Sequence, residues 1–315
     1  MVPPQAPGDD IGRRLDPALE HFAGIRTDLS PAVLGAVRDS LNQRRAEAAP
    51  TVDDVGVEIE QREIRLAAQQ SVRVRIYRGA PAPSPALLYF HSGAFVLGNL
   101  DTDHRQCVEF ARRGRCTVVS AEYRLAPEHP FPAAADDALA ILRWAVDAAV
   151  EVGLDTAALA VGGSSAGASL AARLAQCAAA GEAPPVMFQL LHQPVLDDRP
   201  SPSKDEFTTT PGFDADAVAW MWRHYLADTP PSADAAPARA EELAGLAPAL
   251  ITCSELDPLR DEAVDYALRL MWAGVRTELH VFAGTCHGFD SLLPEWEVST
   301  QLFEIQGSAL RRAFW

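Results

Sequence analysis

The sequence has no long apolar run and no excess of positive charge. Its apolar stretches fall short of the roughly 20 residues that a membrane-spanning helix needs, so we expect no membrane partner. Lysine and arginine together number 27 against 43 aspartates and glutamates, which gives a formal net charge of -16. Such a surface repels phosphate backbones and anionic lipid heads, so we also expect no nucleic-acid partner.

Cysteine is scarce and lacks the spacing of a metal or redox motif. The five cysteines form no CxxC pair, so we predict reduced, mostly buried thiols and no metal site. The first ten residues contain prolines and acids, where a signal peptide needs a basic start and then an apolar run. We therefore expect a cytoplasmic protein.

The chain does contain the balance of a folded, water-soluble enzyme, with 48% hydrophobic and 22% charged residues. Its 315 residues suffice for one domain with an insertion or for two domains. Val72, Val74 and Ile76 alternate with polar or amphipathic residues, which predicts an outer antiparallel strand where the sheet begins.

Six short continuous apolar runs predict central parallel strands at 86–90, 117–121, 158–161, 186–191, 249–252 and 279–282. Helical patterns alternate with these runs and cover residues 133–152, 166–180 and 261–272. Strands that alternate with helices are typical of a doubly wound, mostly parallel α/β sheet.

Two segments interrupt this alternation. The N-terminal segment is predicted to form short helices, because Asp16-Pro17 and Ser30-Pro31 each offer an N-cap followed by proline at the first helical position. A later segment is rich in proline and aspartate and contains an aromatic helix at 213–225. We therefore expect an α/β core formed by residues 51–196 and 247–315. The cap is expected to be formed by residues 1–50 and 197–246.

The chemistry is indicated first by Gly163-Ser164-Ser165-Ala166-Gly167, a GxSxG sequence between a predicted strand and a long helix. That context is typical of a nucleophile elbow, whose glycines are needed because a serine on a tight strained turn leaves no room for side chains two positions away. Ser165 is the predicted nucleophile. Ser164 is the alternative, but a motif centred on it would lose the second glycine. A phosphate-binding loop is disfavoured because no lysine follows.

A serine nucleophile requires a base, usually histidine, and a carboxylate that orients the base. In this type of fold the chain order is serine, acid, histidine. Of eight histidines, only His280 and His287 lie far enough along the chain, and His280 falls inside the last strand pattern. We therefore predict His287 as the base.

The predicted acid is Asp257, which follows a strand and precedes a proline before the next helix. Glu255 and Asp261 are the alternatives, and Asp261 fits better as an acidic residue in the first turn of that helix. Backbone N–H donors for an oxyanion are expected from the loop His91-Ser92-Gly93-Ala94 and from Ala166 at the helix start.

With these residues placed, the sequence resembles the bacterial hormone-sensitive lipase family of esterases within the α/β-hydrolases. The resemblance runs from about Leu87 to Gly288 and includes the loop after the first apolar run, the serine elbow, the acid motif and His287-Gly288-Phe289. It also includes the motif from Tyr123 to Pro132.

The resemblance implies an eight-stranded sheet with an antiparallel second strand, and a helical cap built from the N-terminus and an insertion after the sixth strand. It implies hydrolysis of short to medium acyl esters without metal or organic cofactor. It also implies oxyanion donors at Gly93 and Ala94. Many members of the family form homodimers, so a second copy is an expected partner. Ser92 and Ala94 stand where this family usually has glycine, and Ser164 and Ala168 also depart from its usual elbow.

The leading hypothesis is a carboxylesterase acting on a small-molecule ester. Amide or peptide hydrolysis by the same triad, and a non-catalytic receptor of the same fold, are the alternatives. The aromatic helix is expected to form an apolar roof over the serine that favours small uncharged acyl groups. The candidate substrate contacts, which could equally pack the cap onto the sheet, are Phe213, Trp220, Trp222 and Tyr225.

Overall fold

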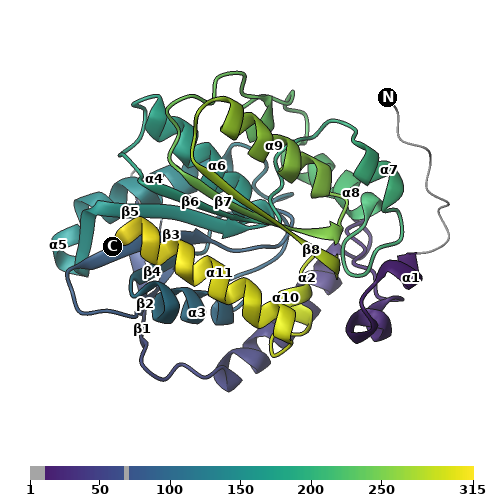
Figure 1. Ribbon diagram of the computed structural model, residues 1–315, viewed down its shortest axis with the longest axis horizontal. Helices are drawn as coiled ribbons and strands as arrows, with labels where there is room; N and C mark the ends of the chain where they lie inside the picture. The colour runs from purple at the N-terminus through teal and green to yellow at the C-terminus, as the bar shows by residue number, and fades with distance from the viewer. Residues whose placement is uncertain (1–10, 67–70) are drawn as a thin grey trace.

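The computed structural model describes residues 11–66 and 71–315 and contains one eight-stranded sheet (Figure 1). The strands are β1 (Glu58–Arg65), β2 (Ser71–Arg78), β3 (Ser84–Phe90), β4 (Thr117–Ala121), β5 (Leu154–Ser164), β6 (Phe188–His192), β7 (Ala249–Leu256) and β8 (Thr277–Cys286). Their order in the sheet is β1-β2-β4-β3-β5-β6-β7-β8. Strand β2 pairs antiparallel with β1 and β4, and the other neighbours pair in parallel.

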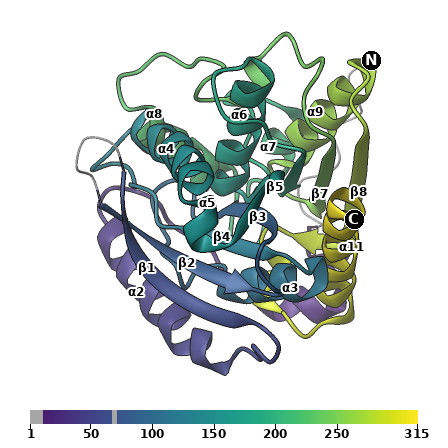
Figure 2. The same cartoon turned by 90° about the vertical axis from the view of Figure 1, so that its left-hand side faces the viewer.

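Helices cover both faces of the sheet. On one face lie α4 (Ala133–Asp147), α6 (Ala166–Ala179) and α9 (Arg260–Trp272), and on the other lie α3 (His104–Gly114) and α11 (Glu297–Phe314), as Figures 1 and 2 show. The short helices α5 (Ala149–Val152) and α10 (Phe289–Leu292) precede β5 and α11. This is the predicted α/β arrangement.

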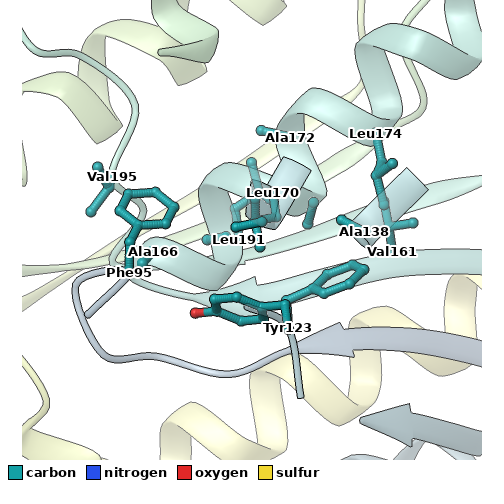
Figure 3. Close-up of a cluster of buried hydrophobic side chains, with 14 of the residues drawn as sticks. Phe95, Tyr123, Ala138, Val161, Ala166, Leu170, Ala172, Leu174, Leu191 and Val195 are labelled. Carbon is teal, nitrogen blue, oxygen red and sulfur yellow. The ribbon is translucent and has the colours of Figure 1, made fainter. Parts of the chain in front are cut away.

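The inner parallel strands contain continuous apolar runs because these runs are buried on both faces. In β3, Leu87 and Tyr89 pack against α3 and α11, whereas Leu88 and Phe90 face the opposite cluster. Figure 3 shows part of that cluster, in which side chains of α4 and α6 meet the sheet. Burial on both faces removes the alternation of apolar and polar residues, and five of the six predicted central parallel strands are confirmed. The sixth, at 279–282, lies in the parallel strand β8, which forms an edge of the sheet and is only partly buried.

The prediction that the sheet begins near Val72 is wrong. Strand β1 precedes it and forms the edge, so β2 lies inside the sheet with a neighbour on each side. The sequence of β1, EIEQREIR, is mostly charged and largely exposed, so it has too few apolar residues to show a clear strand pattern. The antiparallel second strand implied by the family resemblance is confirmed.

The N-terminal segment contains α1 (Ile11–Arg14), the 3-10 helix η1 (Pro17–Phe22), α2 (Leu34–Ala48) and η2 (Ala49–Thr51), while residues 1–10 of the predicted cap lie outside the described residues. Asp16 caps η1 as predicted, because its side chain accepts a hydrogen bond from Ala18 N–H. The predicted helix start at Ser30-Pro31 is wrong. Residues 31–33 form a turn stabilised by Ser30 C=O, and α2 begins at Leu34.

The insertion between β6 and β7 contains α7 (Pro202–Glu206), α8 (Ala215–Leu226) and the 3-10 helix η4 (Pro237–Arg239). It contacts the N-terminal segment directly. Gly212 N–H donates to Ile25 C=O at 2.9 Å, Thr27 N–H donates to Gly212 C=O at 3.1 Å, and Arg26 lies 3.6 Å from Asp214. In the part of the chain that is described, no helix combines the length and apolar character needed to cross a bilayer.

Candidate active site

The strand register brings four strand ends to one edge of the sheet. Ser164 in β5 is opposite His192 in β6, which is opposite Thr252 in β7. Strands β7 and β8 continue past these residues to a final pair, Leu256 and Cys286. The residues that follow these ends therefore share one edge, as ligand-facing residues of parallel sheets do.

Ser165 lies on the sharp turn between β5 and α6. Its φ of 55° and ψ of -117° are sparsely populated for a residue with a side chain. Two hydrogen bonds fix the turn, from Ser165 N–H to His192 C=O at 2.8 Å and from Val195 N–H to Ser165 C=O at 3.2 Å. Ser164 remains inside β5. The strained elbow predicted from the sequence is thus present at Ser165.

The two glycines of the motif face each other across this turn. A Cβ added to Gly163 would lie 2.3 Å from the carbonyl carbon of Gly167. A Cβ added to Gly167 would lie 1.9 Å from the carbonyl oxygen of Phe90. Both neighbours are backbone atoms, which cannot rotate away, so the turn requires glycine at these positions for lack of space.

Ser165, His287 and Asp257 form one hydrogen-bonded chain. His287, the residue after β8, places Nε2 3.0 Å from Ser165 Oγ and Nδ1 2.8 Å from Asp257 Oδ2. The Asp257 side chain is completely buried, and its Oδ1 accepts the Leu259 N–H at 2.8 Å. The three residues predicted from chain order therefore lie within hydrogen-bond reach of one another.

The alternative residues face elsewhere. His280 lies inside β8, 2.8 Å from Glu278. Glu255 accepts the Gly284 N–H at 2.9 Å and lies 3.2 Å from Arg14, and Asp261 accepts the Ser203 N–H at 2.8 Å.

Two buried cysteines lie beside Asp257. Burial, together with the negative charge of Asp257, raises the pKa of Cys253 and of Cys286 to about 12. Both remain neutral thiols at physiological pH, and a thiol is a much weaker nucleophile than a thiolate. All five cysteines of the chain are free and buried, as predicted. Neither thiol therefore competes with Ser165 as a candidate nucleophile at this edge of the sheet.

The loop after β3 has an unusual backbone. Gly93, Ala94 and Phe95 have φ angles of 133°, 54° and 59°, so two residues with side chains occupy the left-handed region. Within residues 11–66 and 71–315, the N–H groups of Gly93, Ala94 and Ala166 have no hydrogen-bond acceptor. Figure 3 shows Phe95 next to Ala166 and Val195, so this loop lies against the start of α6.

Asp103 anchors this loop and was missed by the sequence analysis. Its carboxylate accepts the Ser92 N–H at 2.8 Å, the Ser92 hydroxyl at 2.9 Å and the Tyr89 hydroxyl at 3.0 Å. Ser92, which replaces the usual glycine, therefore contributes a second bond to the anchor. Tyr123 also donates to His91 C=O at 2.8 Å. The Ser92 hydroxyl was a signal that a polar partner should be sought.

His91 is a buried, neutral part of the same loop. Burial lowers the pKa of its imidazole, although a bond to Ser92 C=O at 2.8 Å opposes that effect. Its ring stacks on Tyr123 with centroids 4.3 Å apart. His91 therefore stabilises the loop by packing.

The four predicted cap residues have different surroundings. The Phe213 ring lies 4.8 Å from the His287 ring, and Tyr225 stacks on Phe95 with centroids 3.7 Å apart. Trp222 lies 6.4 Å from Phe95. Trp220, which is partly exposed, instead stacks on His224 at 5.8 Å. Three of the four thus contact the serine-histidine site or its adjoining loop.

Gln193 also contacts the histidine loop and was missed by the sequence analysis. Its Oε1 accepts the Gly288 N–H at 2.7 Å, although the two residues are 95 positions apart. No local pattern indicated this contact.

Among the residues that the structure describes, no group of three His, Cys, Asp or Glu side chains is arranged to hold a metal ion.

An eight-stranded sheet with one antiparallel strand inside it, and a strained serine turn between strand and helix, define an α/β hydrolase. Residues 87–291 match a family model described as alpha/beta hydrolase fold. Esterase LipI of Mycobacterium tuberculosis is 44% identical over 212 residues, 66% of each chain. Carboxylesterase NlhH of that organism is 38% identical over 244 residues, 73% of this chain and 75% of its own.

The crystal structure of esterase LipW from Mycobacterium marinum is 57% identical and has a TM-score of 0.95, covering 96% of this chain and 97% of that one. A structure titled Bacterial Heroin Esterase is 35% identical with a TM-score of 0.89, covering 96% and 99%. The chain belongs to the bacterial hormone-sensitive lipase family of α/β-hydrolase esterases. This confirms the predicted fold class and family resemblance.

Proposed function

We propose that this protein is a carboxylesterase that hydrolyses short to medium acyl esters through an acyl-enzyme on Ser165. The observation that carries the proposal is the hydrogen-bonded chain from Ser165 Oγ through His287 to Asp257, at 3.0 Å and 2.8 Å. A nucleophile, a base and an orienting carboxylate in that order constitute the machinery of acyl transfer. The esterase names of the relatives support the same reaction.

In the proposed first step, Ser165 Oγ attacks the ester carbonyl carbon while His287 Nε2 takes the hydroxyl proton. The resulting tetrahedral intermediate carries an oxyanion, which the N–H groups of Gly93, Ala94 and Ala166 stabilise. Its collapse expels the alkoxide, which leaves as an alcohol after receiving the proton from His287. An acyl group then remains on Ser165.

In the second step, water attacks the acyl carbon and gives its proton to His287 Nε2. Collapse of this second intermediate breaks the bond to Ser165 Oγ, the serine regains its proton, and the carboxylic acid leaves. Asp257 holds the Nδ1 proton of His287, which keeps Nε2 free to accept and stabilises the imidazolium. Because Leu259 N–H occupies Asp257 Oδ1, the carboxylate presents Oδ2 to the ring.

The proposed substrate is a small uncharged ester. Phe213 lies beside His287, and Tyr225 and Trp222 pack against the loop that carries the proposed oxyanion donors. These rings make an apolar roof, and a net charge of -16 gives no attraction to anionic substrates. A receptor without catalysis is disfavoured because His287 is retained within hydrogen-bond distance of Ser165.

The test is hydrolysis of p-nitrophenyl esters from acetyl to palmitoyl by the wild type and two matched variants. We expect the best kcat/KM between acetyl and hexanoyl, loss of turnover by about 10⁶-fold in Ser165→Ala, and retained turnover in Ser164→Ala. A maximum at palmitoyl would contradict the proposed chain length. An inactive Ser164→Ala beside an active Ser165→Ala would contradict the proposed nucleophile.

A further inference from the structure

Gln193 occupies a strained position directly after β6. Its φ of 45° lies in the left-handed region, which a glutamine enters only at a conformational cost. The residue is 1% exposed, so the bonds that offset the strain must come from the protein and not from solvent. Such strain persists only where surrounding bonds hold it, and it is concentrated at functional sites.

The side chain of Gln193 connects to the peptide groups on both sides of His287. Its Oε1 accepts the Gly288 N–H at 2.7 Å. Its Nε2 donates to Ser254 Oγ at 2.6 Å, and that hydroxyl donates to Cys286 C=O at 3.0 Å. One amide and one hydroxyl therefore fix the backbone that carries the imidazole.

The backbone beside Gln193 also fixes the serine turn. His192 C=O accepts the Ser165 N–H at 2.8 Å, and Gln193 N–H donates to Thr252 C=O at 2.6 Å. The two-residue segment 192–193 is thus bonded to the nucleophile turn on one side and to the histidine loop on the other. The distance between Ser165 Oγ and His287 Nε2 depends on both.

The histidine loop needs such support because its own sequence supplies little. Strand β8 ends at Cys286, and Gly288, with a φ of 74°, has no side chain to pack. Phe213 restrains the imidazole as a ring neighbour from the cap, but a ring contact does not fix the backbone. Hydrogen bonds to residues 286 and 288 restrain the position from which the ring extends.

We infer that Gln193, acting through Ser254, is a positioning residue that holds the His287 backbone at bonding distance from Ser165. This inference rests on the proposed function, because it assigns Gln193 a role in proton transfer at the same site. Loss of the side chain would misplace the base without removing it. Misplacement by about 1 Å can lower the rate by about 100-fold.

The experiment compares Gln193→Ala with Gln189→Ala. Gln189 is a matched control because it lies in β6, just before Gln193, is fully buried, and donates its side-chain amide in a hydrogen bond to Ala247 C=O at 2.8 Å. We expect Gln193→Ala to lower kcat for p-nitrophenyl butyrate by about 10- to 100-fold with KM within 2-fold. Gln189→Ala should keep kcat within 2-fold while lowering the melting temperature similarly.

A double-mutant comparison tests the relay through the hydroxyl. Ser254→Ala should lower kcat by a smaller factor, and Gln193→Ala/Ser254→Ala should be no slower than Gln193→Ala alone, because both changes break one connection. Independent, multiplicative losses would contradict the relay. Equal kcat losses in Gln193→Ala and Gln189→Ala, or a change confined to KM, would overturn the positioning role.

A second variant decides the question if Gln193→Ala does not fold. Asparagine tolerates the left-handed backbone but is one methylene shorter, so Gln193→Asn keeps the amide and loses its reach. It should show the same selective loss of kcat, and full kcat would overturn the inference. Failure of the proposed function itself would appear differently, as undiminished turnover in Ser165→Ala.

Discussion

The edge of the sheet that carries Ser165 and the cap above it are held by different forces. At the edge, Ser165 and Asp257 are almost completely buried and are fixed by directional hydrogen bonds. In the cap, α8 rests on the loop through stacked rings such as Tyr225 on Phe95. Directional bonds fix atoms to fractions of an ångström, whereas ring packing tolerates exchange of similar shapes.

Ion pairs and cation–π contacts complete the attachment of the cap. Arg14 of the N-terminal segment pairs with Glu255 at 3.2 Å, and Arg260 at the start of α9 pairs with Glu206 of α7 at 3.1 Å. Both guanidinium groups lie over the Phe207 ring, at 5.6 Å and 4.9 Å. We therefore propose that the catalytic residues lie at the edge of the sheet and that the substrate preference depends on a separate segment, residues 197–246.

The sharpest contrast lies between two acids at the end of β7. Asp257 bonds to His287, whereas Glu255, two residues earlier, bonds to Arg14 and to Gly284 N–H. Asp257→Asn should lower kcat by about 10⁴-fold because the imidazole then adopts the wrong tautomer. Glu255→Gln should keep kcat within a few-fold. Steady-state kinetics on p-nitrophenyl butyrate measures both, and equal losses would contradict the assignment of the orienting carboxylate to Asp257.

A glycine-to-alanine change should decrease the free energy of unfolding at the serine turn and increase it in the N-terminal segment. Gly167→Ala places a methyl group 1.9 Å from Phe90 C=O and should reduce the free energy of unfolding by about 3 kcal/mol. Gly35→Ala, in α2, meets nothing within 4 Å and should increase that free energy by about 0.5 kcal/mol. Urea unfolding measures both. A Gly167→Ala protein as stable as the wild type would contradict the argument from space.

Within the cap, Phe213 and Trp220 should differ in their effect on substrate binding. Phe213→Ala removes the ring 4.8 Å from His287 and should raise KM for butyryl esters about 10-fold, which corresponds to about 1.4 kcal/mol. Trp220→Ala should change KM by less than 2-fold, because its ring stacks on His224 and on Arg223. The p-nitrophenyl ester series measures both. A larger effect at Trp220 would assign the acyl pocket to the other side of α8.

A further expected effect concerns acid stability. Burial alone would raise the pKa of Asp290, but the His192 charge and hydrogen bonds from His192 and Gln106 hold that pKa below its usual value. An acid with a depressed folded-state pKa contributes stability above its unfolded pKa of about 3.9 and loses it as pH falls through the lower, folded value.

Asp290→Asn should therefore be less stable than the wild type by about 2 kcal/mol at pH 7, and this difference should shrink below pH 4. Urea unfolding from pH 7 to pH 3 measures the difference. Glu295→Gln is the control, because the Glu295 side chain is 82% exposed and its ion pair with Arg105 should contribute little at any pH. A difference for Asp290→Asn that stays constant with pH would contradict the assigned charge state.

The features that could be predicted from the sequence are those that depend on residues close together in the chain. Apolar runs located the central strands, and the glycine pair around Ser165 located the elbow, because each depends on local burial or local space. Chain order, together with positions just after predicted strands, singled out His287 and Asp257 as candidates. Strand β1 could not be found, because this exposed edge strand carries charged residues on both of its faces and so shows no alternation of apolar and polar residues.

Contacts between distant residues could not be predicted. Asp103 and Gln193 fix the two loops of the site through partners that no local pattern specifies. The helix start at Leu34 differed from the Ser30-Pro31 signal because a turn intervenes. A homodimer, a cytoplasmic location and the division into core and cap segments stay predictions.

The central claim is that the hydrogen bonds from Asp257 to His287 and from His287 to Ser165 activate Ser165 as the single nucleophile. Its most direct test is reaction with a fluorophosphonate probe followed by peptide mass spectrometry, because the probe requires an activated serine and a stabilised oxyanion. We predict a single phosphonylated residue, Ser165, and labelling that disappears in Ser165→Ala but persists in Ser164→Ala. Ester hydrolysis without labelling, or a label on Ser164 in the wild type, would contradict the account.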